Sequence, residues 1–141
     1  MTDLILSLFL LNTQTQGLPP GLLESICYIE SKHTITAIHH DDGGSNSVGI
    51  CQIKLSTARW LGFKGDERKL MIPSINIFYA ALYLKKLSYR YKNDWTKVII
   101  AYNMGSAKFK KTKYSDKVNK YWDANKPYNK GEQTIWHLRS Y

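Results

Sequence analysis

The spacing of apolar residues constrains the fold of this chain most, because it is helical along nearly the whole length. In one segment, four residues recur at positions i, i+3, i+4 and i+7, on one face of a helix: Leu23, Ile26, Cys27 and Glu30. No run of strand length alternates convincingly between apolar and polar residues. The pattern predicts an all-α fold, and a chain of 141 residues is the size of a single domain.

Proline and turn residues predict where the first helices lie. Proline suits the first helical turn, so a second helix should begin near Pro19-Pro20 and a long one at Pro73. A short helix should run from about Ser56 through Trp60. Residues 33–47 are polar and rich in glycine, which predicts a loop before that short helix.

Capping residues and an apolar stripe predict the later helices. The long helix should bury residues that recur at helical spacing: Ile77, Ala80, Ala81, Leu84 and Leu87. Asn93 or Asp94 can cap the next helix, which Gly105 should end. A final helix should cover Ser115 to Trp122.

An apolar stretch, Leu4–Leu11, lies near the start of the chain. It is far shorter than the ~20 residues that span a bilayer. Neither a basic segment before it nor a small-residue cleavage site after it supports an export signal. We therefore expect a buried first helix and no transmembrane segment, with a degenerate export signal as the alternative.

The charge of the chain is strongly positive and uneven. Lys and Arg number 20 against 11 Asp and Glu, a formal net charge of +9, and residues 108–141 hold 9 of the basic and 3 of the acidic groups. A basic surface favours nucleic acid, an anionic membrane or an anionic cell wall. Aromatic residues among the lysines would also suit a single nucleic-acid strand. A basic tail that is simply solvated is the alternative.

The cysteines and histidines do not predict a metal site. Cys27 and Cys51 lie in apolar stretches, where cysteine is usually a small buried hydrophobe, and a bridge between them stays open. The run His39–Asp42 contains metal-ligand types, but four successive residues rarely point at one ion. We expect neither a metal nor a cofactor.

Glu30 is the most informative single residue, because its carboxylate falls on an otherwise apolar helix face. Such burial is costly unless the group is paired or protonated. Burial raises the pKa of a carboxylic acid, which a general acid that works near neutral pH requires. The alternatives are a half-exposed boundary residue or a member of a buried ion pair. Glu24 lies off this face and is interpreted as a surface charge.

Further motifs follow Glu30-Ser31 in a defined order. They are Gly49–Ile53, Thr57-Ala58, the segment from Pro73 through Asn76-Ile77 to Tyr83-Leu84, Ala101–Gly105, and Tyr114–Tyr121. Together, over residues 18–122, they resemble the catalytic domain of the soluble lytic transglycosylases in the goose-type lysozyme superfamily. Each motif alone is weak, but their order and spacing are specific. Ala101–Gly105 matches the family's Ala-Tyr-Asn-x-Gly motif fully.

The sequence also departs from the family pattern. Ile50-Cys51 stands where Leu-Met is usual, which keeps an apolar lining. Lys54-Leu55 replaces a common Met-Pro, which leaves the local turn open. The loop from His39 to Asn46 is more polar than in many relatives and could reshape the mouth of the cleft.

The resemblance implies a lysozyme-like helical domain with a substrate cleft. Its implied reaction is cleavage of the β-1,4 bond between N-acetylmuramic acid and N-acetylglucosamine in peptidoglycan. Glu30 would protonate the glycosidic oxygen and then act as base on the muramoyl C6 hydroxyl, which attacks the anomeric carbon to give a 1,6-anhydro product. Ordinary glycosidases need two carboxylates, and the internal nucleophile removes that need.

The resemblance further implies which residues bind substrate. Ser31 would hydrogen-bond near the acid or the substrate, and Gln52, Tyr102 and Asn103 would line the cleft. Tyr114 is a further candidate. Tyr102 could instead be a core aromatic residue, and Asn103 merely a residue at a helix C-terminus.

Three alternatives to this function stay open. If Asp41 or Asp42 reaches the cleft opposite Glu30, it could activate water, and the enzyme would be a muramidase that hydrolyses the same bond. The two aspartates could equally belong to a solvated loop turn. The chain could also be a non-catalytic module that keeps the fold and binds the wall or serves as a structural part. A nucleic-acid-binding role would instead show steep salt dependence.

These inferences divide the chain into three parts. Residues 1–17 form an N-terminal apolar helix within the domain, residues 18–124 the lysozyme-like catalytic domain, and residues 125–141 a basic tail. The expected partners are peptidoglycan glycan strands and, through the tail, anionic wall polymers, but no nucleic acid. We expect a monomer that acts at the bacterial wall, in the periplasm or outside the cell. A bacteriophage lysis or entry enzyme and a wall-remodelling accessory of a bacterial envelope system both fit.

Overall fold

The computed structural model describes residues 1–40 and 44–126, and helices make up most of them. The helices are α1 (Asp3–Gln16), α2 (Leu22–Ser31), α3 (Leu55–Trp60), α4 (Glu67–Leu70), α5 (Pro73–Arg90), α6 (Trp95–Met104) and α7 (Lys113–Asn125). The predicted helical class is therefore confirmed. None of the helices in these ranges is long and apolar enough to cross a membrane.

A small antiparallel sheet accompanies the helices. Its strands are β1 (Ile38–His39), β2 (Ser47–Val48) and β3 (Ile53–Lys54), in the order β1-β2-β3. Ile38 pairs with Val48, and Val48 pairs with Ile53 on its other side. This sheet was not predicted, and β1 lies within the expected loop of residues 33–47. Strands of two residues are too short for the alternation that reveals longer strands.

Most helix ends agree with the capping residues. Pro73 begins α5, and Asp94 caps α6 by accepting a hydrogen bond from the Lys97 backbone at 3.3 Å. Gly105 ends α6 in the left-handed region. α2 begins at Leu22, later than predicted, because Gly21 adopts φ +84°, which a helix interior does not contain.

The last helix is longer than predicted. α7 starts at Lys113 rather than Ser115, because Thr112 and Ser115 form a capping box. α4 was not predicted at all. It is a single turn whose cap, Asp66, accepts a hydrogen bond from the Lys69 backbone at 2.9 Å.

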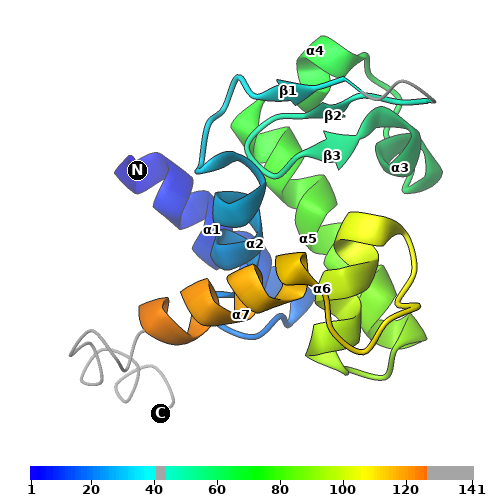
Figure 1. Cartoon of the computed structure of the whole chain (residues 1–141). Coiled ribbons are helices and arrows are strands. Elements are labelled where there is room, and N and C mark those ends of the chain that lie inside the picture. Colours follow the sequence, from blue (N-terminus) through cyan, green and yellow to red (C-terminus); the bar gives the residue numbers. More distant parts are fainter. Residues whose placement is uncertain (41–43, 127–141) are drawn as a thin grey trace.

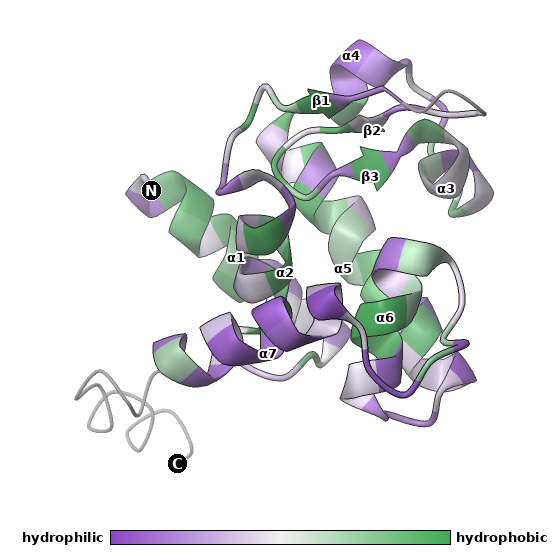
Figure 2. Ribbon diagram, in the orientation of Figure 1, coloured by the Kyte–Doolittle hydropathy of each residue, from purple (hydrophilic) through white to green (hydrophobic). Residues whose placement is uncertain are grey.

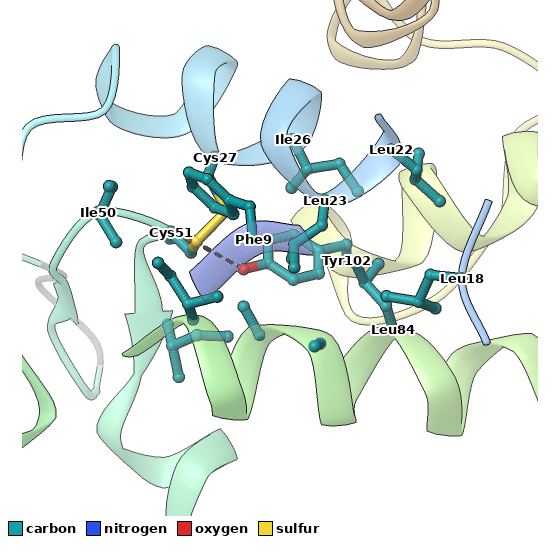
Figure 3. Packing of buried hydrophobic residues seen from close by; sticks show 14 of the residues in the cluster. Phe9, Leu18, Leu22, Leu23, Ile26, Cys27, Ile50, Cys51, Leu84 and Tyr102 are labelled. Atoms are coloured by element: carbon teal, nitrogen blue, oxygen red, sulfur yellow. Dashed lines mark hydrogen bonds between the residues drawn. A yellow bond between two sulfur atoms is a disulfide. The ribbon is translucent and has the colours of Figure 1, made fainter. Parts of the chain in front are cut away.

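The core lies where the helices meet. Figure 3 shows Phe9 of α1, Leu23 and Ile26 of α2, and Leu84 of α5 pointing into one cluster. Each of these side chains is fully buried, as is the entire predicted stripe of α5. In Figure 2, α6 is largely hydrophobic and α7 largely hydrophilic, which matches the fully buried run Val98–Ala101 and the surface position of α7.

The first helix is only half buried, which corrects the prediction for Leu4–Leu11. Ile5 and Phe9 are buried in the core, whereas Leu4 is 69% and Leu11 60% exposed. Seven of these eight residues are apolar, so they lie on all sides of the helix, whereas α1 packs against neighbours on one side only.

The helices and the sheet form two groups, one at each end of α5, which make the two sides of the molecule. The sheet, α3 and α4 gather at one end of α5, while α1, α2, α6 and α7 pack at the other (Figure 1). α2 packs on α7, and α6 packs on both α5 and α7. The segment Gly49–Gln52, here named the linking turn, lies between β2 and β3 and faces the end of α2.

Candidate active site

A cavity of about 700 Å³ lies between the two sides of the molecule. The side of the sheet contributes Ala37, Ile38, His39, Ser47, Gln52, Ile53, Lys54 and Thr57, and the helices contribute Glu30, Tyr83, Tyr102, Asn103, Met104 and Gly105. Three residues predicted to bind substrate, Gln52, Tyr102 and Asn103, thus line one cavity together with Glu30. Among the described lining residues, Glu30 carries the one carboxylate.

Glu30 occupies the last turn of α2 and is half buried. Its Oε2 accepts a hydrogen bond of 2.8 Å from the Tyr114 hydroxyl of α7. Burial raises the pKa of Glu30 to about 7, and the Tyr114 hydrogen bond partly opposes that rise. A carboxyl group with this pKa is protonated in a large fraction of molecules at neutral pH, so it can donate a proton there.

No ion pair within residues 1–40 and 44–126 includes Glu30, and its pKa reflects burial and the Tyr114 hydrogen bond. The ion-pair alternative from the sequence is therefore wrong within the described part of the chain. A buried carboxyl group without a counter-charge is costly to ionise, so it keeps its proton to a higher pH. A general acid must be protonated before it can act.

Glu24, on the same helix, is also more buried than predicted. Burial raises its pKa, and its Oε1 has no hydrogen-bond partner among the described residues. The interpretation as a surface charge is therefore wrong, because α7 packs over this part of α2. Unlike Glu30, Glu24 does not line the cavity.

The linking turn is held by a buried amide beneath it. Asn76 of α5 is fully buried, and its Oδ1 accepts a hydrogen bond of 2.8 Å from the Cys51 backbone. Its Nδ2 donates to the carbonyl oxygens of Val48 and Leu70 at 2.8 and 2.9 Å. Gly49 adopts φ +82°, and a Cβ there would collide with the Asn76 amide. Glycine is thus required at position 49 by both backbone angle and space.

Two further side chains tie the linking turn to the helices that carry the site. Ser31 Oγ donates to the Ile50 carbonyl oxygen at 2.6 Å and accepts from the Thr34 backbone at 3.0 Å. The Tyr102 hydroxyl donates to the Cys51 carbonyl oxygen at 2.7 Å. These bonds fix the position of the turn relative to Glu30.

A disulfide completes this connection. Cys27 of α2 and Cys51 of the linking turn are bonded and fully buried, as Figure 3 shows beside the Tyr102 hydrogen bond. The bridge that the sequence left open is present, so the two residues are not simply buried thiols. It joins the helix of Glu30 covalently to the turn that ends in Gln52.

Gln52 presents a restricted set of groups to the cavity. Its φ is +53°, and its Nε2 donates to the carbonyl oxygens of Ala37 and Gly49 at 3.0 Å each. Both amide hydrogens are therefore used within the protein. The amide oxygen remains as the polar group that Gln52 can offer a ligand.

Tyr102 and Asn103 are adjacent on α6 but differ in their surroundings. Tyr102 is 8% exposed, and burial, followed by the nearby charge of Glu30, raises the pKa of its hydroxyl well above the usual value. Asn103 is exposed and lines the cavity. Tyr102 therefore shapes the wall, while the Asn103 amide is accessible to a ligand.

Ser31 and Tyr114 lie outside the cavity lining, although both were expected at the site. Ser31 contacts the linking turn, and Tyr114 contacts Glu30 directly. Asp41 and Asp42 fall outside the described residues. Residues 1–40 and 44–126 contain no group of three His, Cys, Asp or Glu that could hold a metal ion.

Two site residues received no role from the sequence. Tyr83 lines the cavity, and its ring lies 5.5 Å from that of Tyr102. Asn76 was noted within a motif, but not as the support of the linking turn. A polar residue next to the apolar stripe of α5 was the available signal, because a buried amide must find partners.

Comparisons with known proteins identify the family and the fold. Residues 7–125 match the transglycosylase SLT domain family. The proteins IpgF of Shigella flexneri and IpgF of Shigella sonnei are each 30% identical over 97 residues, which cover 67% of this chain. The matched part spans 63% of the length of these relatives.

An inactive mutant of the lytic transglycosylase Slt from Pseudomonas aeruginosa shares the fold. Its TM-score is 0.68 at 19% identity, covering 82% of this chain and 23% of that one. On the family match, which spans most of the helices and the whole described cavity, this chain belongs to the transglycosylase SLT domain family.

Proposed function

We propose that this protein is a peptidoglycan lytic transglycosylase. It cleaves the β-1,4 bond between N-acetylmuramic acid and N-acetylglucosamine, with Glu30 as general acid and base. The observation that carries the proposal is the position of Glu30 in the cavity, where burial raises its pKa to about 7. Membership of the SLT family supports the choice of reaction class.

The reaction needs one carboxyl group in two protonation states. Protonated Glu30 gives its proton to the glycosidic oxygen as the bond from the anomeric carbon to that oxygen breaks. The Glu30 carboxylate then takes the proton of the muramoyl C6 hydroxyl, whose oxygen forms a new bond to the anomeric carbon. Glu30 ends protonated, the product is a 1,6-anhydro sugar, and no water is consumed.

The single carboxylate of the described lining fits this outcome. A glycosidase that uses water or a covalent intermediate needs a second carboxylate across the sugar. Among the described lining residues, no second carboxylate accompanies Glu30. An internal hydroxyl nucleophile fits such a cavity.

The other polar groups in the cavity suit an N-acetylated sugar. The Gln52 amide oxygen can accept a hydrogen bond from a sugar N–H or hydroxyl, and the Asn103 amide can donate and accept. The Tyr114 hydroxyl holds the carboxyl group of Glu30 in place. Ser31, through the linking turn, keeps Gln52 opposite Glu30 and acts as a positioning residue.

The disulfide supports a site of action outside the cytoplasm, because buried structural disulfides belong to oxidising compartments. The relatives are bacterial proteins, and none of these comparisons supports the bacteriophage setting. The lysines of the segment before α7 and of α7 itself are exposed, and they suit an anionic wall polymer. Residues 127–141, most of the expected basic tail, lie outside the described residues.

Mass spectrometry of soluble products from purified peptidoglycan sacculi tests the proposal. Products that end in anhydromuramic acid, lighter by one water than hydrolysed ones, are expected. Glu30→Gln should abolish their release, while Glu24→Gln should retain it. The Glu24 variant is a matched control, because it makes the same change on the same helix outside the cavity.

Three results would contradict the proposal. Products with reducing ends would assign the protein to the muramidases. Release that persists in Glu30→Gln would remove Glu30 from its role. A folded wild-type protein that releases nothing but binds sacculi would instead be a wall-binding module.

A further inference from the structure

A second cavity of about 260 Å³ opens beside the main one. It is lined by Ser56, Thr57, Trp60, Tyr83, Arg90 and Gly105. Thr57, Tyr83 and Gly105 line both cavities, so the second continues the first. Its volume is below the ~300 Å³ at which pockets for whole small ligands begin. A cavity of this size suits a branch of a substrate whose main part lies next to Glu30.

Arg90 gives the second cavity a positive charge. It is the last residue of α5, is exposed, and makes no ion pair within residues 1–40 and 44–126. Burial raises the pKa of the Tyr83 hydroxyl, and the charge of Arg90 opposes this rise, so its field reaches the wall shared by both cavities. A guanidinium group matches a carboxylate with two parallel hydrogen bonds.

Trp60 supplies the apolar part of the second cavity. Its side chain is 63% exposed at the end of α3. An exposed indole next to an unpaired guanidinium offers a flat apolar face and a charged group to the same ligand. A ligand that uses both therefore carries an aliphatic part and a carboxylate.

Resting on the proposed function, we propose that the second cavity binds the peptide stem that branches from muramic acid in peptidoglycan. Arg90 pairs with a carboxylate of the stem, and Trp60 packs on an aliphatic part of it. A neutral sugar of the glycan strand is the other candidate for the space, but it has no charge to match Arg90. The stem branches from the sugar that reacts at Glu30, which places it beside the main cavity.

The test compares two substrates that differ only in stem charge. One is a stem-bearing glycan strand with free stem carboxylates, and the other is the same strand with those carboxylates amidated. The wild type should cleave the first with a roughly fivefold higher kcat/KM, the upper range for an exposed ion pair. Arg90→Gln should lose that preference and keep its rate on the amidated strand. Arg68→Gln, which makes the same charge change on α4 outside both cavities, should retain the preference.

Equal losses on both substrates in Arg90→Gln would assign the space to a neutral sugar and overturn the proposal. Unchanged rates on both would also overturn it. Calorimetry on the Glu30→Gln protein, with and without Arg90→Gln, separates this result from a failure of the proposed reaction. Stem-bearing strands should bind the Glu30→Gln protein more tightly than the double variant, and amidation should remove the difference. Equal affinity of the Glu30→Gln protein and the double variant for stem-bearing strands, or no binding by either, would refute the stem site whatever the catalytic outcome.

Discussion

Replacing Glu30 by glutamine should stabilise the folded protein at alkaline pH while it removes the activity. Glutamine has nearly the same shape, can still accept the Tyr114 hydrogen bond, and carries no charge. The folded protein would no longer have to hold a buried carboxylate. A catalytic group that is held in an unfavourable environment costs stability.

The size of the effect follows from the pKa of Glu30. In the unfolded chain the carboxyl group titrates near its ordinary value of 4.5, whereas in the folded protein its pKa is about 7. One pKa unit corresponds to about 1.4 kcal/mol, so ionised Glu30 lowers the free energy of unfolding by about 3 kcal/mol. The folded state binds the proton more tightly. Wild-type stability therefore falls as pH rises from 4.5 to about 7, and the full cost is present above that range.

Urea unfolding of the wild type and Glu30→Gln, followed by circular dichroism at about pH 4 and about pH 8.5, measures this difference. The two proteins should be similarly stable at the acidic pH, and the variant more stable by about 3 kcal/mol at the alkaline pH. Other titrating groups cancel in the comparison, because both proteins contain them. A stability difference that is the same at both pH values would refute the argument that burial shifts the pKa of Glu30.

Further expected outcomes concern the reaction and the linking turn. The rate of anhydromuropeptide release should fall above a pH of about 7, where Glu30 loses its proton, and a pH–rate profile checks this. Tyr114→Phe removes a hydrogen bond that lowers the pKa of Glu30, so the alkaline limb of the same profile should move to higher pH. If the alkaline limb does not move, the Tyr114 hydrogen bond does not lower the pKa of Glu30. Reduction of the bridge between Cys27 and Cys51, 24 positions apart, should lower the free energy of unfolding by about 3 kcal/mol in denaturant titrations. Gly49→Ala forces a strained backbone and a collision with a buried amide, so its midpoint should drop in thermal unfolding; an unchanged midpoint would show that the turn can relax.

Much of the helical framework was predictable because its signals are local. The apolar stripe of α5, the cap at Asp94 and the left-handed end at Gly105 depend on residues within a few positions of one another. Such patterns are readable without knowledge of distant contacts. The two-residue strands and the single turn of α4 were missed because they are shorter than the period that a pattern needs.

The residues of the candidate site were also predictable only in part. The sequence alone selected Glu30 as a carboxyl group on an apolar face, and the resemblance to a family named Gln52, Tyr102 and Asn103 as residues of one cleft. The bridge from Cys27 to the linking turn could not be chosen from the spacing of two cysteines.

What the sequence determined by itself is most of the helices, several of their ends and the unusual placement of one glutamate. Only the tertiary structure decided the chemistry of that glutamate. Its pKa depends on packing by elements far along the chain, and its hydrogen bond comes from Tyr114, 84 positions away. Asn76 supports the linking turn from 25 positions beyond Cys51. Local patterns report neighbours within a helical turn, whereas desolvation and hydrogen bonds between distant segments exist only once the chain has packed.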